Sequence, residues 1–258
     1  MSAAKFQRVK VMGERGTGTN FVSQTIHANF DTELLVQPEG STIPGTEKLR
    51  RPDVSELRKN AIAQRVEDYQ HATGIASFGG WKHACLTDRV AAREDVLFVC
   101  VLRHPAPWSL SLHKLPFSTY LAVPDTLEGF LAQPWITRPR DEIVELILDG
   151  PAVLWRLKTE SYLNQAADRA NVVIVQHEQF LKNYISVMDD LRNHLVPKDD
   201  NWKLVTSYGR NFQEEGPDYW EIQAALPEDP WTLVSSDAAQ VLRTQIGTQL
   251  IQRAGYVP

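Results

Sequence analysis

The chain has 258 residues, of which 43% are hydrophobic and 23% charged, and its formal net charge is −5. This length suits one α/β domain, and the apolar fraction is sufficient for a full core. The acidic balance argues against broad nucleic-acid binding, but it leaves room for a local basic pocket. The two cysteines, Cys85 and Cys100, are too few for a disulfide framework, and we expect both to be buried and reduced.

The N-terminal sequence lacks the charged and apolar regions of a signal peptide, and no apolar run reaches the ~18 residues of a membrane-spanning helix. We therefore expect a cytoplasmic protein without a membrane span. The seven histidines and two cysteines show no metal-ligand spacing, so no metal is expected.

The first predicted strand is Val9–Met12, and a glycine-rich turn from Gly13 to Asn20 follows it. Val22, Ile26 and Phe30 then fall at helical spacing and predict a helix directly behind the turn. A strand, a tight turn and a helix in this order direct backbone N–H groups and the positive end of the helix at one spot. Such a spot suits a phosphate or a sulfate.

The turn is similar to a P-loop but lacks two of its functional groups. Gly13 and Gly18 stand five residues apart, as in a P-loop, but Thr19 and Asn20 occupy the next positions, where a P-loop has lysine and then serine or threonine. That lysine binds the β- and γ-phosphates and that hydroxyl binds Mg²⁺. The turn is therefore expected to hold a phosphorylated group without the lysine or a metal.

The remaining elements alternate between strands and helices. Up to residue 102 the sequence predicts a strand at 33–36, a helix near 54–70 with Tyr69 facing inward, a short strand within 78–86 and a fully buried strand at 96–102. A helix opened by Pro105 follows, and then helices at about 141–149 and 152–168. The C-terminal part is predicted to contain a fully buried strand at 172–175, a helix over 178–195 and a last helix capped by Ser236 or Asp237. This alternation predicts an α/β fold, a three-layer P-loop-like domain whose central, mostly parallel sheet has helices on both faces.

Three predicted strand ends carry residues capable of chemistry. They are Gly13–Asn20, the pair Lys82 and His83, and Arg103. Ligands in open parallel sheets bind outside the carboxyl ends of the strands. The three strand ends are therefore expected to form one site.

In this order, the three strand ends resemble the sulfotransferase family that uses the donor 3′-phosphoadenosine-5′-phosphosulfate (PAPS). Residues 16–20, Gly-Thr-Gly-Thr-Asn, resemble the family's 5′-phosphosulfate loop, and Trp81-Lys82-His83 resembles its strand-end lysine and histidine. Arg103 and Ser111 have the eight-residue spacing of the arginine and serine that bind the donor's 3′-phosphate. The run from Gly13 to Phe21 also looks like the opening of a bacterial and plant branch of the family.

The resemblance covers residues 9–112 well and the rest of the chain only in general terms. It implies a single sulfotransferase-like domain over 1–258 that moves a sulfuryl group from PAPS to a hydroxyl or amine and releases adenosine 3′,5′-bisphosphate. The donor-binding core would comprise about 9–112 and 172–195, and acceptor-side insertions would lie at about 37–56, 115–141 and 199–232. The acceptor would be a small molecule or a saccharide, and neither its identity nor the oligomeric state follows from the sequence.

The resemblance also implies roles for individual residues. His83 would be the general base, and Lys82 or Arg15 would replace the family's loop lysine, which aligns with Gly16. The residues expected to bind the donor are Gly13, Arg15, Gly16, Thr17, Gly18, Thr19, Asn20, Arg103 and Ser111.

Several other interpretations of these residues stay open at this point. Glu14 is an alternative base, Arg103 can be a structural ion-pair partner, and His83 with Cys85 can form a thiol–imidazole pair. A P-loop kinase or NTPase is the rival enzyme, which the missing lysine and hydroxyl disfavour. A non-catalytic nucleotide-binding domain is the rival from another class, and Gly16 in place of lysine keeps this alternative open.

Overall fold

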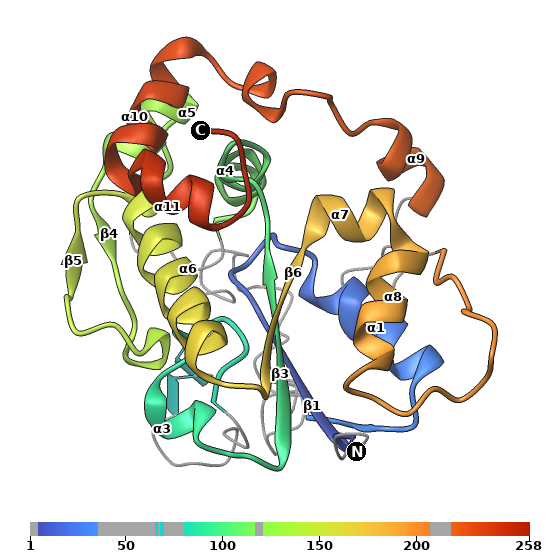
Figure 1. Ribbon diagram of the computed structural model, residues 1–258. Coiled ribbons are helices and arrows are strands. Elements are labelled where there is room, and N and C mark those ends of the chain that lie inside the picture. Colours follow the sequence, from blue (N-terminus) through green and yellow to red (C-terminus); the bar gives the residue numbers. More distant parts are fainter. Residues whose placement is uncertain (1–4, 36–64, 67, 70–79, 117–120, 207–217) are drawn as a thin grey trace, which may run out of the picture.

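Four described strands form a parallel sheet in the centre of the molecule (Figure 1). The computed structural model describes residues 5–35, 65–66, 68–69, 80–116, 121–206 and 218–258. The strands are β1 (Arg8–Met12), β2 (Glu33–Leu34), β3 (Val96–Leu102) and β6 (Val172–Gln176), in the spatial order β2-β1-β3-β6. Every pairing in this sheet is parallel, which confirms the predicted fold class.

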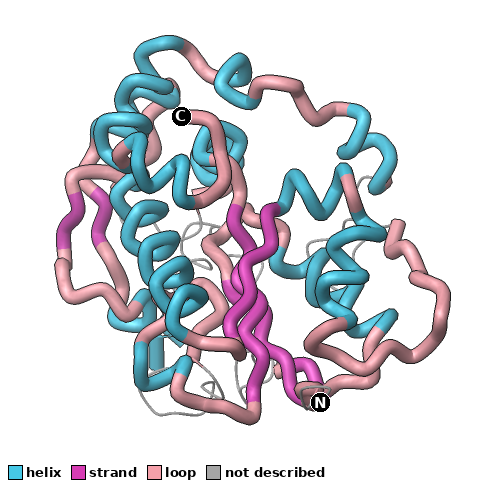
Figure 2. The backbone as a smooth tube through the Cα atoms, viewed as in Figure 1, coloured by secondary structure: helices cyan, strands magenta, loops and turns pink. Residues whose placement is uncertain are grey.

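Helices cover both faces of this sheet, so the domain has three layers (Figures 1 and 2). One face carries α1 (Thr19–Asn29), α7 (His177–Lys182), α8 (Tyr184–Arg192) and α9 (Tyr219–Ala224). The other carries α4 (Pro105–Lys114), α5 (Leu127–Ala132), α6 (Pro151–Asp168), α10 (Ser236–Ile246) and α11 (Thr248–Arg253). The short helix α3 (Asp88–Ala91) precedes β3.

The alternation of side chains along the strands divides the core into two clusters. Val9 and Val11 of β1 pack with α1 and α8, whereas Met12 packs on the opposite face with α4 and α6. All seven residues of β3 are buried, as the unbroken apolar run predicts for a central strand. The apolar stripe of α1 is also confirmed, because Val22, Ile26 and Phe30 are fully buried.

The predicted strand within 78–86 is wrong for the residues that the structure describes there. Gly80 has a left-handed φ of +79°, and the N–H of Ala84 donates to the carbonyl of Trp81 at 2.9 Å, which closes a turn. A single backbone hydrogen bond, from Gly13 N–H to Lys82 O at 2.9 Å, joins this turn to the end of β1. Lys82 and His83 therefore lie on a turn beside the loop and not at the end of a strand.

The predicted helix at 141–149 is also wrong. A 3₁₀ turn at Pro139–Asp141 ends at Glu142, which has a left-handed φ of 58°. The chain then forms β5 (Ile147–Leu148), which pairs antiparallel with β4 (Trp135–Ile136). In this hairpin Leu148 is the residue of β5 that enters the core, whereas Ile147 is exposed.

Three further predictions need smaller corrections. The helix over 178–195 is broken at Asn183 into α7 and α8, and the last helix is broken at Gly247, where φ is +90°. β6 is only partly buried, because it is the outermost described strand on its side of the sheet. Tyr69, expected to face inward, is 61% exposed.

The segments predicted as acceptor-side insertions are described only in part. Residues 37–56 lie outside the described residues, as do 117–120 and 207–217, and so does most of the helix predicted near 54–70. A second 3₁₀ turn, Pro230–Leu233, precedes α10, whose N-cap is Ser235, one residue before the predicted Ser236. Among the described helices none has the length and apolarity needed to cross a bilayer.

Candidate functional site

The glycine-rich turn leads from the end of β1 into the N-terminus of α1. Gly16 and Gly18 adopt left-handed φ angles of 80° and 86°, and Gly18 is the N-cap of α1. No side chain caps this helix, and its first turn holds no acidic residue. The positive end of the helix dipole is therefore not neutralised by a neighbouring carboxylate, which is the condition that favours an anionic ligand.

Gly13 must be glycine because neighbouring groups occupy the space of a side chain. A Cβ atom there would lie 2.7 Å from the carbonyl oxygen of Val101 and 2.7 Å from Oγ1 of Thr17. The hydroxyl of Thr17 donates back to the carbonyl of Glu14 at 2.7 Å, which closes the turn on itself. The loop is thus packed directly against the end of β3, as the predicted convergence of strand ends requires.

The turn of Lys82 and His83 touches the loop at three points. The backbone bond between Gly13 and Lys82 is the first. The ammonium of Lys82 donates to Oδ1 of Asn20 at 2.7 Å, in the first turn of α1. His83 Nδ1 lies 2.6 Å from the carbonyl oxygen of Gly13. Two residues far along the chain are in this way held at the N-terminal end of α1.

The contact between His83 and Gly13 fixes the tautomer of the imidazole. A carbonyl oxygen only accepts hydrogen bonds, so Nδ1 carries the proton and Nε2 carries the lone pair in the neutral ring. Burial, together with the positive charges of Lys82 and Arg15, lowers the pKa of His83 well below its ordinary value. The residue is therefore neutral near pH 7 and has Nε2 available to take a proton.

Arg103 and Ser111 meet the same loop from the other side. Nη1 of Arg103 donates to the carbonyl of Gly16 at 2.7 Å. A Cβ atom at Gly16 would lie 2.9 Å from Oγ of Ser111, so the hydroxyl packs directly against the glycine. Nε of Arg103 is buried and has no acceptor in the part of the chain that the structure describes. The predicted residues of all three segments are thereby brought together.

A buried ion-pair cluster holds the part of the glycine-rich loop at Glu14 and Arg15. The ammonium of Lys158, on α6, contacts a carboxylate oxygen of Glu14 and lies 2.7 Å from Oδ1 of Asp141. The other oxygen of Glu14 accepts from the backbone N–H of Arg15 at 2.7 Å. Burial alone would lower the pKa of Lys158, but the two carboxylates outweigh burial and raise it. Glu14 is therefore a structural ion-pair partner in this geometry.

Cationic side chains surround the indole of Trp81, next to this cluster. The guanidinium carbons of Arg15 and Arg140 lie 4.7 and 4.3 Å from the ring centroid, and Nζ of Lys158 lies 5.4 Å from it. The His83 ring meets the same indole edge-on, with centroids 5.1 Å apart. Arg15 thus stacks on an aromatic ring behind the loop, whereas Lys82 reaches the N-terminus of α1.

Four buried polar residues near the site were not predicted from the sequence, namely Lys158, Asp141, Arg140 and Lys10. Two of them left a signal, because Lys158 interrupts the apolar stripe of its helix and Lys10 interrupts a Val-rich strand. Lys10 is 1% exposed, and burial together with the charge of Lys82 lowers its pKa to about 8. Arg140 and Asp141 left no signal in the sequence, because their positions depend on a hairpin that the sequence did not predict.

The thiol–imidazole pair finds no support in this geometry. Both cysteines are free and buried, and burial raises the pKa of Cys85 to about 11, so its thiol stays protonated at neutral pH. No group of three or more metal-ligating side chains is present among the described residues. Two hollows lined by described residues lie away from the loop, one along β6 and one between α8 and α9.

The segment that follows Arg103 is anchored by a second polar network. The backbone N–H of His104 donates to Oε1 of Glu178 at 3.0 Å, and the hydroxyl of Tyr256 donates to Oε2 at 3.1 Å. His104 also caps α4, because its Nδ1 accepts from the N–H of Ala106 at 3.2 Å. Burial lowers the pKa of His104 to about 4. The C-terminal tail is thereby tied to the residue next to Arg103.

His104 should make the protein less stable in mild acid. The unfolded chain binds the proton of this imidazole near pH 6.5, whereas the folded protein binds it only near pH 4, so stability is lost as the pH falls through this window. The variant His104→Asn keeps a cap but cannot titrate, and we expect its melting temperature to fall less between pH 7 and pH 4.5. Equal pH slopes for both proteins in thermal melts would contradict this.

Comparison with protein-family models gives no match, and comparison with curated proteins gives none either. The function of the chain is therefore inferred from the geometry of its own residues.

Proposed function

We propose that this protein transfers a sulfuryl group from PAPS to a hydroxyl or amine acceptor. The observation that carries the proposal is the convergence of two separate segments, 82–83 and 103–111, on the glycine-rich loop. His83, Lys82, Arg103 and Ser111 all contact the glycine-rich turn that begins at Gly13. A structural strand–helix turn would not need a cation, a neutral histidine and a second cation around an uncapped helix end.

In this proposal the loop binds the 5′ end of the donor and Arg103 binds the 3′-phosphate. Backbone N–H groups of residue 16 and residues 18–20 and the hydroxyl of Thr19 would hold the phosphosulfate at the N-terminus of α1. Thr17 would instead shape the turn, because its N–H and its hydroxyl both donate to the carbonyl of Glu14. Arg103 presents a planar, charged fork suited to a phosphate, and Ser111 adds a hydroxyl beside it. The buried Nε of Arg103, which lacks an acceptor among the described residues, supports this role.

The transfer step uses His83 as the base. Nε2 takes the proton from the acceptor hydroxyl as its oxygen bonds to sulfur, and the bond from sulfur to the bridging phosphate oxygen breaks in line. The products are the sulfated acceptor and adenosine 3′,5′-bisphosphate, and positioning and charge stabilisation supply most of the rate enhancement. The negative donor would offset the charges that lower the pKa of His83, which makes the imidazole a stronger base once the donor is bound.

Lys82 is the better candidate for the cation that replaces the family's loop lysine. Its ammonium lies 2.7 Å from Asn20 Oδ1 in the first turn of α1, where charge on the leaving phosphate would develop. Arg15 instead stacks on Trp81 and is 9% exposed. We therefore assign Lys82 to the leaving group and Arg15 to the support of the loop.

Replacing Arg103 by alanine should weaken binding of adenosine 3′,5′-bisphosphate by about 10- to 100-fold, because charge-assisted hydrogen bonds contribute roughly 1.5–3 kcal/mol. Isothermal titration calorimetry measures the change directly. Arg169→Ala is a matched control, since that side chain pairs with Asp88 at the far end of α6 and should leave the affinity unchanged.

Three outcomes would overturn parts of the proposal. Unchanged affinity in Arg103→Ala would remove Arg103 from the donor site. Mg²⁺-dependent hydrolysis of ATP would favour a P-loop kinase or NTPase. Tight binding of the bisphosphate without sulfation of any alcohol, phenol, lipid or saccharide in a broad panel would favour a non-catalytic nucleotide-binding domain.

A further inference from the structure

The outer edge of β6 is a row of backbone groups that no described strand pairs. The N–H of Phe98 in β3 donates to the carbonyl of Asn171 at 2.8 Å, so in this parallel register the odd-numbered residues of β6 bond to β3. Ile174 and Gln176 therefore direct their N–H groups outward. The carbonyls of Val172 and Ile174 face the same way.

This edge lacks the features by which proteins normally prevent strand addition. The strand reads Val-Val-Ile-Val-Gln, with no proline, no charged residue and no bulge, and Val173 and Ile174 are only partly buried. An apolar edge of this kind pairs readily with another extended chain. The described structure therefore leaves this edge without a pairing strand and without these protective features.

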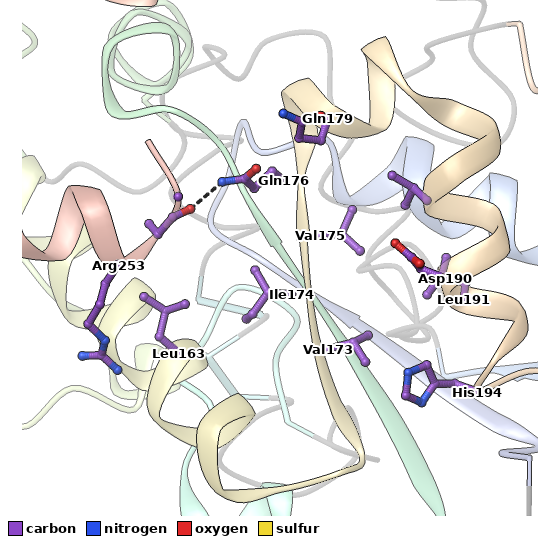
Figure 3. A pocket seen from close by; sticks show the side chains of 13 residues that line it. Leu163, Val173, Ile174, Val175, Gln176, Gln179, Asp190, Leu191, His194 and Arg253 are labelled. Carbon is purple, nitrogen blue, oxygen red and sulfur yellow. Dashed lines mark hydrogen bonds between the residues drawn. The ribbon is translucent and has the colours of Figure 1, made fainter. Parts of the chain in front are cut away.

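The edge forms the floor of a groove of about 460 Å³ (Figure 3). One wall consists of Leu163 of α6 and the segment Arg253–Gly255, and the other consists of Val187, Asp190, Leu191 and His194. Gln176 Nε2 donates to the carbonyl of Ala254 at 2.5 Å and links the end of the strand to the first wall. The groove therefore has a wall on each side of the strand edge.

The charges of the walls indicate which strand fits. Arg253 stands on one wall, and Asp190 stands on the opposite one. Two copies of this chain paired through β6 about a two-fold axis would bring the same groups together, Arg253 against Arg253 and Asp190 against Asp190. Repulsion between these like charges on adjoining walls disfavours self-association. A foreign strand alternates its side chains between the walls and can satisfy both charges.

We propose that this groove binds an extended segment of a partner protein, which adds to β6 as a fifth strand. The segment carries apolar β-branched residues, an acidic side chain on the face toward Arg253 and a basic side chain on the face toward Asp190. Its backbone hydrogen bonds would supply affinity, and its alternating side chains would supply specificity. The groove lies apart from the glycine-rich loop, so this proposal does not depend on sulfuryl transfer.

The test uses the full chain and a synthetic peptide, acetyl-Thr-Lys-Val-Val-Glu-Val-Thr-amide, whose Lys and Glu point to opposite faces. We expect saturable binding in calorimetry, and we expect the amide protons of Ile174 and Gln176 to gain protection from hydrogen exchange. A peptide with Lys and Glu exchanged should bind about tenfold more weakly. The double variant Asp190→Lys/Arg253→Glu changes two exposed side chains, so it should fold normally, and it should reverse this preference.

Different results would overturn the proposal. They are binding without protection of the Ile174 amide, equal affinity for the two peptides, or no binding at millimolar peptide. A dimer in solution in which the amide of Ile174 is protected from hydrogen exchange without peptide would show that a second copy of this chain occupies the groove, which also contradicts a foreign partner. Loss of donor binding in Arg103→Ala has no bearing on these measurements.

Discussion

Replacing Lys158 by alanine should lower the free energy of unfolding by about 3–5 kcal/mol, the largest effect on stability that we expect from one substitution. The ammonium is 1% exposed and lies between the carboxylates of Glu14 and Asp141, which are 4% and 3% exposed. Without it two buried carboxylates face each other with no cation between them. Denaturant unfolding followed by circular dichroism measures the loss.

The cause can be separated from simple loss of packing. In the background Glu14→Gln/Asp141→Asn the carboxylates are neutral amides, so Lys158→Ala should cost clearly less than in the parent protein. Lys182→Ala, an exposed lysine at the end of α7, is the matched control and should change stability by no more than about 0.5 kcal/mol. If Lys158→Ala costs the same in both backgrounds, the ion pairs do not explain its effect.

The same substitution should also weaken donor binding, because Lys158 holds Glu14 and Glu14 holds the backbone of Arg15. Lys158 thus supports the loop, whereas Lys82 and Arg103 are the cations proposed to contact the donor.

Substituting His83 should reduce turnover by about 10²- to 10⁴-fold, the usual contribution of a general base. Two variants separate the role of His83 as a base from its contact with the carbonyl of Gly13. His83→Asn retains an N–H donor for the carbonyl of Gly13 but has no basic nitrogen in place of Nε2, whereas His83→Ala loses both. We expect equal losses of kcat in the two variants, and we expect weaker donor binding only in His83→Ala. Sulfation of an acceptor found in the panel, assayed together with calorimetry, distinguishes these outcomes.

The pH profile offers an independent check on this histidine. Because the pKa of His83 is lowered in the free protein, the acid limb of kcat/KM should lie well below pH 6.5. Turnover within about threefold of the parent protein in His83→Ala would remove His83 from the role of base.

Much of the fold could be predicted because its signals are local. The apolar runs at 96–102 and 172–175 and the stripe of α1 each form the predicted element, although the second run lies at the edge of the described sheet and is only partly buried. The predictions of two elements, the strand within 78–86 and the helix at 141–149, were wrong. The turn at Lys82 depends on a left-handed Gly80, and the hairpin after Asp141 depends on pairing with Trp135–Ile136.

The residues of the candidate site were likewise predictable only in part. The residues around the loop were found because glycines, threonines and an arginine with a serine eight residues later form a recognisable pattern. Lys158 and Arg140 were not found, because a buried cation is recognisable only when its partners are known.

The sequence by itself determined the central strands β1, β3 and β6, the helix α1 and the glycine-rich turn between β1 and α1, since hydrophobic periodicity and backbone preference are properties of neighbouring residues. Only the tertiary structure decided that His83 is neutral with Nε2 available, that Glu14 is an ion-pair partner and that β6 has an open edge. These three features depend on contacts between segments far apart in the chain, and burial sets the charge state of a side chain only once those segments have come together.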